Sequence, residues 1–394
     1  MPWREITPMS EQLAFIIDCL DRSEPISEIC RRYGISEKTG YKRLKRLREH
    51  GIDGIYDRSR ARLTHPFRIT EDVRSEIISL KRKFRHYGPK TIRDILMQRD
   101  PEAHWPAASS IGEILRQNNL VRPKRKHFSE AHSSLGHGRT RATEPNIVWT
   151  ADFKGQFRLG LKGNYCYPLT VMDLNTRYLL SCKALESTAV ATAESVFLRL
   201  FKEYGLPKVI RTDNGVPFCQ PNAIGRLGRL GFLWVRLGIK PEHIKPATPL
   251  ENGAHERFHR TLKIATVNPP SKSVTSQQRR FDSFRSEYNN HRPHTSLPDH
   301  RPPAEFYTKS TRPFPTRLPV IEYPLEWEVR LVSESGQFKW KDQALNLSNN
   351  LAGQYVGIAE TEDGLTVSYA ALELGQIEIN PTRFMPKLRW TGVP

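Results

Sequence analysis

The sequence predicts a multidomain chain with helical modules at the N-terminus, a central α/β domain, and a small β-barrel at the C-terminus. Amphipathic helical patterns fill the first 120 residues. From Pro145 onward, runs rich in β-branched and aromatic residues alternate with helical patterns, as in mixed α/β domains. Beyond residue 324, short strand patterns alternate with glycine-containing turns, which is typical of a small barrel.

The charge of the chain indicates a polyanionic partner. Lys and Arg total 61 against 42 for Asp and Glu, which gives 394 residues a net charge of +19. Such an excess favours nucleic acid as the partner, with a merely soluble basic protein as the alternative. The five cysteines form no C-x-x-C pair, so we expect neither a disulfide framework nor a zinc site. No apolar run approaches the ~18 residues that span a bilayer, so we expect no membrane partner.

Residues 1–58 have the pattern of a helix-turn-helix DNA-binding domain. Residues 10–22 form an amphipathic helix with Leu13, Ile16, Ile17 and Leu20 at helical spacing. A second, short helix ends at Gly34, and Ser36 caps a basic third helix. The third helix of this motif enters the major groove, although similar three-helix units also serve as plain packing modules. The DNA-contacting residues that we expect on this helix are Lys38, Thr39, Lys42, Arg43, Lys45 and Arg46.

Residues 66–127 predict a second helical DNA-binding domain. Apolar periodicity places helices near residues 70–85, 89–99 and 108–119, with Pro89 at a helix start. The basic stretch VRPKRKHF at its end either follows phosphates or is an ordinary solvated linker. Residues 128–144 are assigned to a linker.

Residues 145–308 predict the α/β core. Strands are expected in NIVWTADFKGQF, NYCYPLTVMDL, RYLLSCKAL, PKVIRTD and FLWVRLGI, with helices near residues 188–204, 252–266 and 276–291. Residues 309–324 are proline-rich and predict an extended linker. Residues 325–394 predict the barrel, with Gly336 and the Asp363-Gly364 pair at hairpin turns. The barrel serves either DNA contact or a structural or dimerising role.

Three carboxylates of the core have the setting of a metal-dependent phosphodiester-transfer site. Asp152 lies within an otherwise apolar strand, and Asp213 closes a strand before the Asn214-Gly215 turn. A buried aspartate needs a partner or a cation, and open α/β sheets bind ligands beyond the carboxyl ends of their strands. Glu256 lies in a helix that carries His259, Arg260 and Lys263 on the same face, as a helix lying against DNA would require. Taken singly, each carboxylate also fits a salt bridge or a turn.

The strings W-x-x-D-F, T-D-N-G and N-G-x-x-E-R-x-H-R-T-L-K occur in this order on strand, strand and helix. Together they resemble the core of D-D-E transposases and retroviral integrases, and most closely bacterial insertion-sequence transposases with an integrase-type catalytic domain. The resemblance covers nearly the whole chain, including YNNHRPHTSL and PPAEFY. It implies a ribonuclease-H-like core.

The resemblance also implies site residues, cofactors and partners. Asp152, Asp213 and Glu256 would be the catalytic acids and would hold two Mg²⁺ ions, for which Mn²⁺ would substitute. Glu251 competes with Glu256, because the spacer after Asp213 is longer than is usual in the family. Asn214, Gly215 and Asn252 would shape the active-site loops, and His259, Arg260 and Lys263 would contact DNA.

The expected function is a DNA transposase that binds terminal inverted repeats, cleaves the element ends and joins their 3′-hydroxyls to target DNA. The expected assembly is a homodimer or larger homo-oligomer on double-stranded DNA, in the bacterial cytoplasm with the nucleoid. The alternatives are a catalytically inactive, transposase-derived DNA-binding regulator and, on fold analogy alone, a nuclease that cuts RNA in hybrids.

Overall fold

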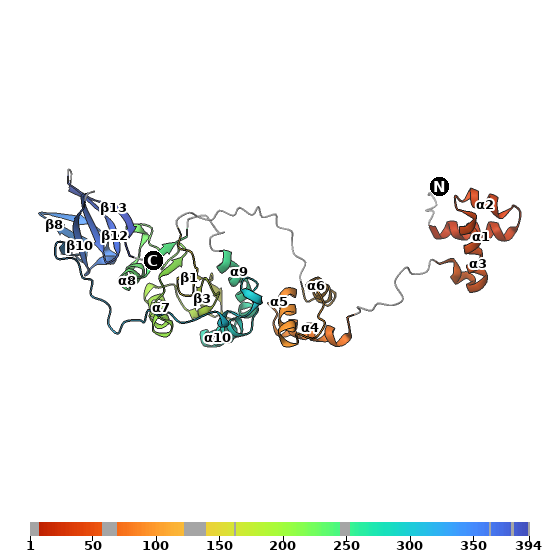
Figure 1. Ribbon diagram of the computed structural model, residues 1–394, viewed down its shortest axis with the longest axis horizontal. Helices are drawn as coiled ribbons and strands as arrows, with labels where there is room; N and C mark the ends of the chain where they lie inside the picture. Colours follow the sequence, from red (N-terminus) through yellow and green to blue (C-terminus); the bar gives the residue numbers. More distant parts are fainter. Residues whose placement is uncertain are drawn as a thin grey trace. The chain divides into compact units, whose positions relative to one another are not determined.

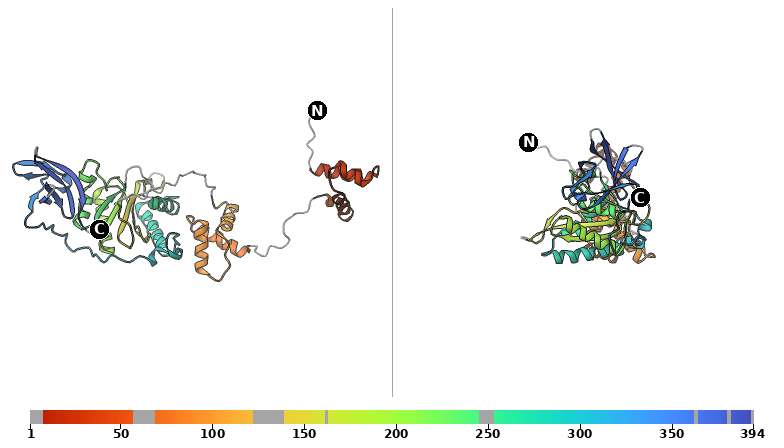
Figure 2. Two further views of the ribbon diagram at one scale, coloured as in Figure 1. Left: turned by 45° about the horizontal axis from the view of Figure 1, so that its top comes forward. Right: turned by 90° about the vertical axis from the view of Figure 1, so that its left-hand side faces the viewer.

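The computed structural model describes residues 8–56, 69–121, 139–160, 163–244, 253–361, 364–379 and 382–392. The chain divides into two compact units, residues 1–68 and residues 69–394. Both are drawn in Figures 1 and 2, and each is described here by itself. Within the described residues, no helix has the length and apolar character needed to cross a membrane.

The first unit is a bundle of three helices and a final 3₁₀ turn. It contains α1 (Pro8–Asp21), α2 (Ile26–Arg32), α3 (Glu37–His50) and η1 (Gly51–Ile55). The Ser36 side chain caps α3 by accepting a hydrogen bond from the backbone N–H of Thr39. A Cβ atom at Gly40 would collide with the sulfur of Cys30, so glycine lets α3 pack closely against α2.

The buried face of α1 differs from the one predicted. Phe15, Ile16 and Cys19 are buried, whereas the exposed fractions of Leu13, Ile17 and Leu20 are 45%, 57% and 62%. Residues 13–20 of the helix supply two adjacent apolar stripes, and periodicity alone does not decide which of them meets the core.

The second unit begins with three helices, α4 (Glu71–Lys83), α5 (Pro89–Arg99) and α6 (Ala108–Gln117), as the periodicity predicts. Their common core contains Ile77, Leu80, Ile92, Leu96 and Ile111. This helical group contacts helix α10 (Val274–Asn290) of the core. The Tyr87 hydroxyl donates a hydrogen bond to the Glu287 carboxylate of α10. His86 Nε2 lies 3.2 Å from the other oxygen of the same carboxylate.

The core contains a mixed sheet with the order β2-β3-β1-β5-β6, in which β4 also pairs with β3. β1 is antiparallel to β3 and parallel to β5, and β5 is parallel to β6. The strands are β1 (Val148–Phe153), β2 (Phe157–Arg158), β3 (Tyr165–Asp173), β4 (Leu179–Leu185), β5 (Val209–Thr212) and β6 (Lys240–His243).

Helices cover both faces of this sheet. On one face, α7 (Val190–Tyr204) and α8 (Arg229–Arg236) pack against Trp149, Ala151 and Ile210. On the other face, α9 (Gly253–Leu262) and α10 pack against Met172, Leu179 and Cys182. Because side chains alternate along a strand, Thr150 and Asp152 lie on the α9 face.

The strand predicted at FLWVRLGI is wrong, because this segment forms helix α8 and the strand follows later as β6. Leu230 and Trp234 pack into the sheet core, while Phe232 and Val235 pack into a second core on the other side of the helix. A short run that is apolar on both sides cannot be assigned to helix or strand by periodicity.

The C-terminal region forms two sheets and not the closed barrel that the sequence predicts. A five-stranded sheet has the order β13-β12-β11-β10-β7, and β8 and β9 form a separate two-stranded sheet among the described strands. Phe338 and Trp340 of β8 share one core with this sheet, so the hairpin packs onto it without closing it. The strands are β7 (Glu328–Leu331), β8 (Gln337–Trp340), β9 (Gln343–Asn346), β10 (Tyr355–Thr361), β11 (Gly364–Tyr369), β12 (Leu372–Ile379) and β13 (Thr382–Trp390).

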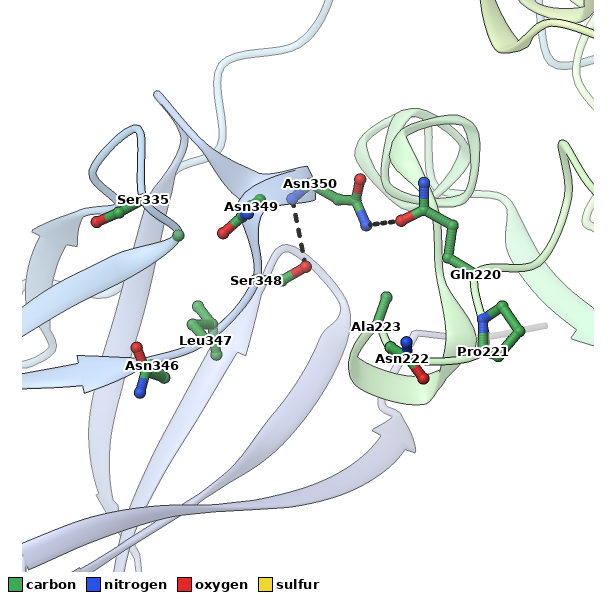
Figure 3. Close-up of a pocket in the computed structure, with 11 residues that line it drawn as sticks. Gln220, Pro221, Asn222, Ala223, Ser335, Asn346, Leu347, Ser348, Asn349 and Asn350 are labelled. Atoms are coloured by element: carbon green, nitrogen blue, oxygen red, sulfur yellow. Dashed lines mark hydrogen bonds between the residues drawn. The ribbon is translucent and has the colours of Figure 1, made fainter.

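The C-terminal sheets dock onto α8 and the short helix η2 (Ile224–Arg226) of the core. The Asn350 side chain donates hydrogen bonds to Gln220 Oε1 at 2.6 Å, shown in Figure 3, and to the Leu227 carbonyl at 3.2 Å. Beside this contact lies a cavity of about 470 Å³ lined mainly by amide and hydroxyl side chains.

Candidate active site

Asp152 and Asp213 come from neighbouring parallel strands at the same edge of the sheet. The register of β1 and β5 ends with the pair Ala151 and Thr212, and each aspartate is the next residue. Ala151 faces α7 and α8, so strand alternation places Asp152 on the α9 face. Asp213 directly follows Thr212, the last residue of β5, at the carboxyl end of that strand. The structure therefore brings together two of the three predicted acids.

Asp213 is a half-buried carboxylate in a tight turn. Burial raises its pKa, while a hydrogen bond from the Gly215 backbone and the nearby His243 act in the opposite direction. A Cβ atom at position 215 would lie 3.0 Å from Oδ2 of Asp213, so glycine lets the chain turn directly against the carboxylate. Gly215, which the sequence analysis expects to shape an active-site loop, thus lies in the turn beside Asp213.

Near Asp213, two buried polar atoms have no hydrogen-bond partner among the residues that the structure describes. The Asn214 amide donates to the Ile244 carbonyl at 2.7 Å, but its Oδ1 atom is unpaired. His243 Nδ1 lies 3.1 Å from the Thr212 hydroxyl, and its Nε2 atom is unpaired. No sequence pattern selects His243, because its position beside Asp213 depends on the pairing of β5 with β6.

Two histidines of α9, His255 and His259, lie against β1 and β3 close to Asp152. Nε2 of His255 and Nε2 of His259 each lie 2.8 Å from the Thr170 hydroxyl, which donates to the Asp152 carbonyl at 3.0 Å. His255 Nδ1 lies 3.1 Å from the Thr150 hydroxyl. These contacts attach α9 to β1 and β3 directly behind the Asp152 carboxylate.

Both histidines are electrically neutral at physiological pH. Burial lowers the pKa of His255 to about 3. Burial also lowers the pKa of His259 to about 2, with smaller contributions from His255 and from the charge of Lys154. Neutral imidazoles can bind and orient neighbouring groups without adding positive charge.

The position of His259 corrects the expectation that it lies with Arg260 on an outward, DNA-contacting face. Its side chain is 11% exposed and points to Thr170 and Asp152, whereas Arg260 and Lys263 are exposed. His255 lies one helical turn before His259 on the same inward face. The i, i+4 spacing of the two histidines is the sequence pattern that could have identified His255.

Lys154 is a further cation at this site. Burial and the charge of Lys263 lower its pKa, and the Asp152 carboxylate raises it. Lys154 follows Asp152 by two positions, so strand alternation would have placed both on one side of the chain. Lys154 and Lys263 together make the surroundings of Asp152 electropositive.

Glu256 lies on the first turns of α9 and is exposed. Among the described residues, no group of three or more His, Cys, Asp or Glu side chains is placed to hold a metal ion. The half-buried Asp213 carboxylate and the Asn214 and His243 atoms that have no partner among the described residues fit a cation and its water ligands, but in this part of the chain Glu256 does not complete a three-acid site with the aspartates. Asn252 and the rival Glu251 lie outside the described residues.

In the first unit, the expected DNA-contacting residues lie on α3. Lys38, Lys42 and Lys45 are exposed, and Arg43 and Arg46 are half-buried. The Thr39 hydroxyl lies 2.9 Å from the Ser36 hydroxyl, so it takes part in the helix cap.

Comparison with known families assigns the same regions. Two models described as "Integrase core domain" match residues 142–249 and 237–303. A model described as "Helix-turn-helix domain" matches residues 14–62, and one described as "Homeodomain-like domain" matches residues 39–115.

Curated relatives are retroviral polyproteins. The chain is 29% identical over 126 residues to the Pol polyprotein of feline endogenous virus ECE1, which covers 32% of this chain and 11% of the relative. It is 24% identical over 201 residues to the Gag-Pol polyprotein of gibbon ape leukemia virus, which covers 51% of this chain and 11% of the relative. The chain therefore spans about a tenth of the length of these relatives.

Two solved structures show more distant likeness. An intasome of simian T-cell lymphotropic virus, in complex with PP2A regulatory subunit B56 gamma, is 17% identical, with 81% of this chain and 99% of that chain covered and a TM-score of 0.37. The HTLV-2 integrase catalytic core domain in complex with magnesium is 15% identical, with 43% and 100% covered and a TM-score of 0.32.

The core thus has a mixed sheet with aspartates at neighbouring positions of β1 and β5, and helical domains precede it. The integrase-core matches, the helix-turn-helix match and the retroviral relatives together indicate likeness to transposases and integrases of the retroviral-integrase-like type.

Proposed function

We propose that the chain is a DNA transposase that binds the terminal inverted repeats of a mobile element, cleaves the element ends and joins their 3′-hydroxyls to target DNA. The observation that carries this proposal is that Asp152 in β1 and Asp213 just after β5 occupy neighbouring positions of two parallel strands, in the region that matches the integrase-core model. The net charge of +19 and the helix-turn-helix matches support DNA as the substrate.

Asp152, Asp213 and Glu256 would hold divalent ions, Mg²⁺ or in its place Mn²⁺, which supply charge neutralisation in phosphodiester transfer. Completion of this site requires Glu256 to approach the two aspartates. His255, His259 and Thr170 would hold Asp152 in position. Lys154, Arg260 and Lys263 would attract the phosphates of the DNA end, while Asn214, Gly215 and Asn252 shape the loops around it.

The residues of α3 would supply the contacts with the inverted repeats. Exposed Lys38, Lys42 and Lys45 are placed for phosphate contacts, which add affinity but carry no sequence information. Two ends must be joined, so the active assembly would be a homodimer or a larger oligomer.

A second candidate is a DNA-binding regulator that descends from such an enzyme and no longer cuts DNA. The exposed position of Glu256, away from a three-acid cluster among the described residues, favours it.

The test is cleavage of DNA that carries the repeat ends from the genomic locus. We expect the parent protein to release 3′-hydroxyl ends in Mg²⁺ and Asp213→Asn to abolish cleavage while DNA affinity stays unchanged. Glu256→Gln and Glu251→Gln, compared side by side, identify the third acid. Retained cleavage in Asp213→Asn would overturn the assignment, and a parent that binds but never cuts supports the regulator.

A further inference from the structure

The segment YNNHRPHTSL, which the proposed chemistry does not use, helps to line a small cavity on the core. This cavity, about 210 Å³ in volume, lies between α9, the end of α10 and the β3–β4 turn. Its lining includes Arg177, Arg257, Thr261, Tyr288, Arg292 and His294.

Among the described residues, no carboxylate lies in salt-bridge contact with the three arginines of this cavity. Nη1 of Arg177 and Nε of Arg292 are buried and have no hydrogen-bond partner within the same residues. In the part of the chain that the structure describes, none of the three guanidinium groups forms a salt bridge, and no acidic residue lines the cavity. Arg177 and Arg292 are half-buried and Arg257 is exposed. Partly buried guanidinium groups without salt bridges are unfavourable, so the cavity is complementary to an anion.

The neighbouring aromatic side chains fix this arrangement. The Arg292 guanidinium lies over the Tyr288 ring, 5.4 Å from its centroid. Burial first, and then the charges of Arg292, Arg177 and Arg257, lower the pKa of His294 to about 4. Its Nδ1 atom lies 2.9 Å from the Ser296 hydroxyl. The cavity therefore combines fixed positive charge with a neutral imidazole.

The backbone of Arg177 points to a role for its side chain. Arg177 lies in the turn between β3 and β4 with φ of 62°, a left-handed conformation that favours glycine or asparagine. Burial lowers the pKa of its guanidinium, with smaller opposing contributions from Tyr288 and the Asp173 carboxylate, so both the backbone conformation and the burial are unfavourable for an arginine here. Such conflicts concentrate at functional sites.

We propose that this cavity binds one backbone phosphate of the DNA substrate. The inference rests on the proposed function, which supplies DNA as the ligand. The cavity is smaller than the ~300–1,000 Å³ of ordinary ligand pockets, so it suits a single group projecting from a larger molecule. Guanidinium groups bind phosphate oxygens in pairs, and α9 carries both Arg257 and the proposed catalytic Glu256. A phosphate held here would fix the path of a DNA strand along α9.

The test measures affinity of the full chain for a mixed-sequence duplex in EDTA at several NaCl concentrations. Arg177→Gly removes the charge and relieves the backbone, so it should fold at least as well as the parent. We expect about ten-fold weaker binding at low salt, and a salt slope, log Kobs against log [NaCl], that is smaller by about 1. Arg257 is exposed, and Arg257→Gln should lower the affinity and the salt slope in the same way as Arg177→Gly.

Two further variants act as controls. Arg177→Lys keeps the charge but loses the paired hydrogen bonds, so the slope should remain while affinity falls partway. Arg279→Ala removes an exposed charge from α10 outside the cavity and should keep both affinity and slope near those of the parent.

The outcomes separate this inference from the proposed function. If Arg177→Gly and Arg257→Gln keep the parental affinity and slope while the parent cleaves repeat-end DNA, the cavity inference is overturned and the transposase assignment stands. If the variants bind less tightly with a smaller slope and the parent never cleaves, the cavity stands and the catalytic assignment fails. A parent that binds no DNA overturns both.

Discussion

Nδ1 of His259 lies 3.9 Å from Oδ2 of Asp152, although the two residues come from a helix and a strand that are far apart in the chain. The contact is part of a hydrogen-bonded group in which Thr170 touches both His255 and His259. This arrangement couples the position of α9, which carries Glu256, to the strand that carries Asp152.

Replacing His259 should impair the proposed metal site more than the fold. We expect His259→Ala to raise the Mg²⁺ concentration for half-maximal cleavage by about 10–100-fold, because the support of Asp152 is lost. His259→Gln should recover part of the loss, since its amide can still donate to Thr170. Cleavage of repeat-end DNA over a Mg²⁺ series is the measurement. An unchanged Mg²⁺ dependence in His259→Ala would contradict a positioning role.

The buried histidine His255 should make the protein less stable in acid. Between about pH 3, its pKa in the folded chain, and ~6.5, the ordinary value, the unfolded chain binds a proton that the folded chain does not. Stability therefore falls as pH decreases through this window, by about 2 kcal/mol at pH 5 from this group. His255→Gln should flatten the pH dependence of urea unfolding between pH 7 and 5. Exposed His104→Gln is the matched control, and equal pH slopes in both variants would refute the prediction.

Divalent ions should stabilise the parent protein if the aspartates bind them. We expect Mn²⁺ or Ca²⁺ to raise the melting temperature of the parent, because a ligand that binds only the folded state adds stability. The increase should vanish in Asp152→Asn. Lys202→Gln, exposed on α7 on the other face of the sheet, should keep it. A parent that melts at the same temperature with and without these ions would argue against a metal site.

The contact between Tyr87 and Glu287 should contribute to the stability of the second unit. Tyr87→Phe leaves a mostly buried carboxylate without one of its donors, at a cost of about 1–3 kcal/mol. Urea unfolding measures the loss, and faster hydrogen exchange in α4–α6 should accompany it. Tyr355 is 55% exposed, so Tyr355→Phe should change neither the stability to urea nor the hydrogen exchange of α4–α6.

The Phe232 ring should be a main anchor of the C-terminal sheets. It is 2% exposed and packs edge-to-face on Tyr369 with 5.7 Å between ring centroids. Phe232→Ala should destabilise the unit by about 3–5 kcal/mol. A double-mutant cycle with Tyr369→Ala should give a coupling of about 0.5–1.5 kcal/mol. Strict additivity of the two changes would show that the rings act independently.

The sequence predicted the elements that depend on local patterns and missed features that depend on pairing. Helix α5 begins at Pro89 as expected, and β5 ends just before Asp213. The inward position of His259 and the place of His243 could not be predicted, because each depends on how α9 or β6 lies against the sheet. The assembly of three acids into one metal site likewise depends on tertiary structure, so the role of Glu256 as the third acid stays a prediction.

The core that joins α8 to the C-terminal sheets limits how the chain can be divided. One apolar cluster contains side chains from η2, α8 and the C-terminal strands. Its members include Ile224, Leu227, Phe232, Val235, Val356, Val367 and Leu374. A fragment that ends at residue 324 would expose these side chains of η2 and α8 to water and would be prone to aggregate. Recombinant work on the integrase core therefore calls for a polypeptide that extends through β13.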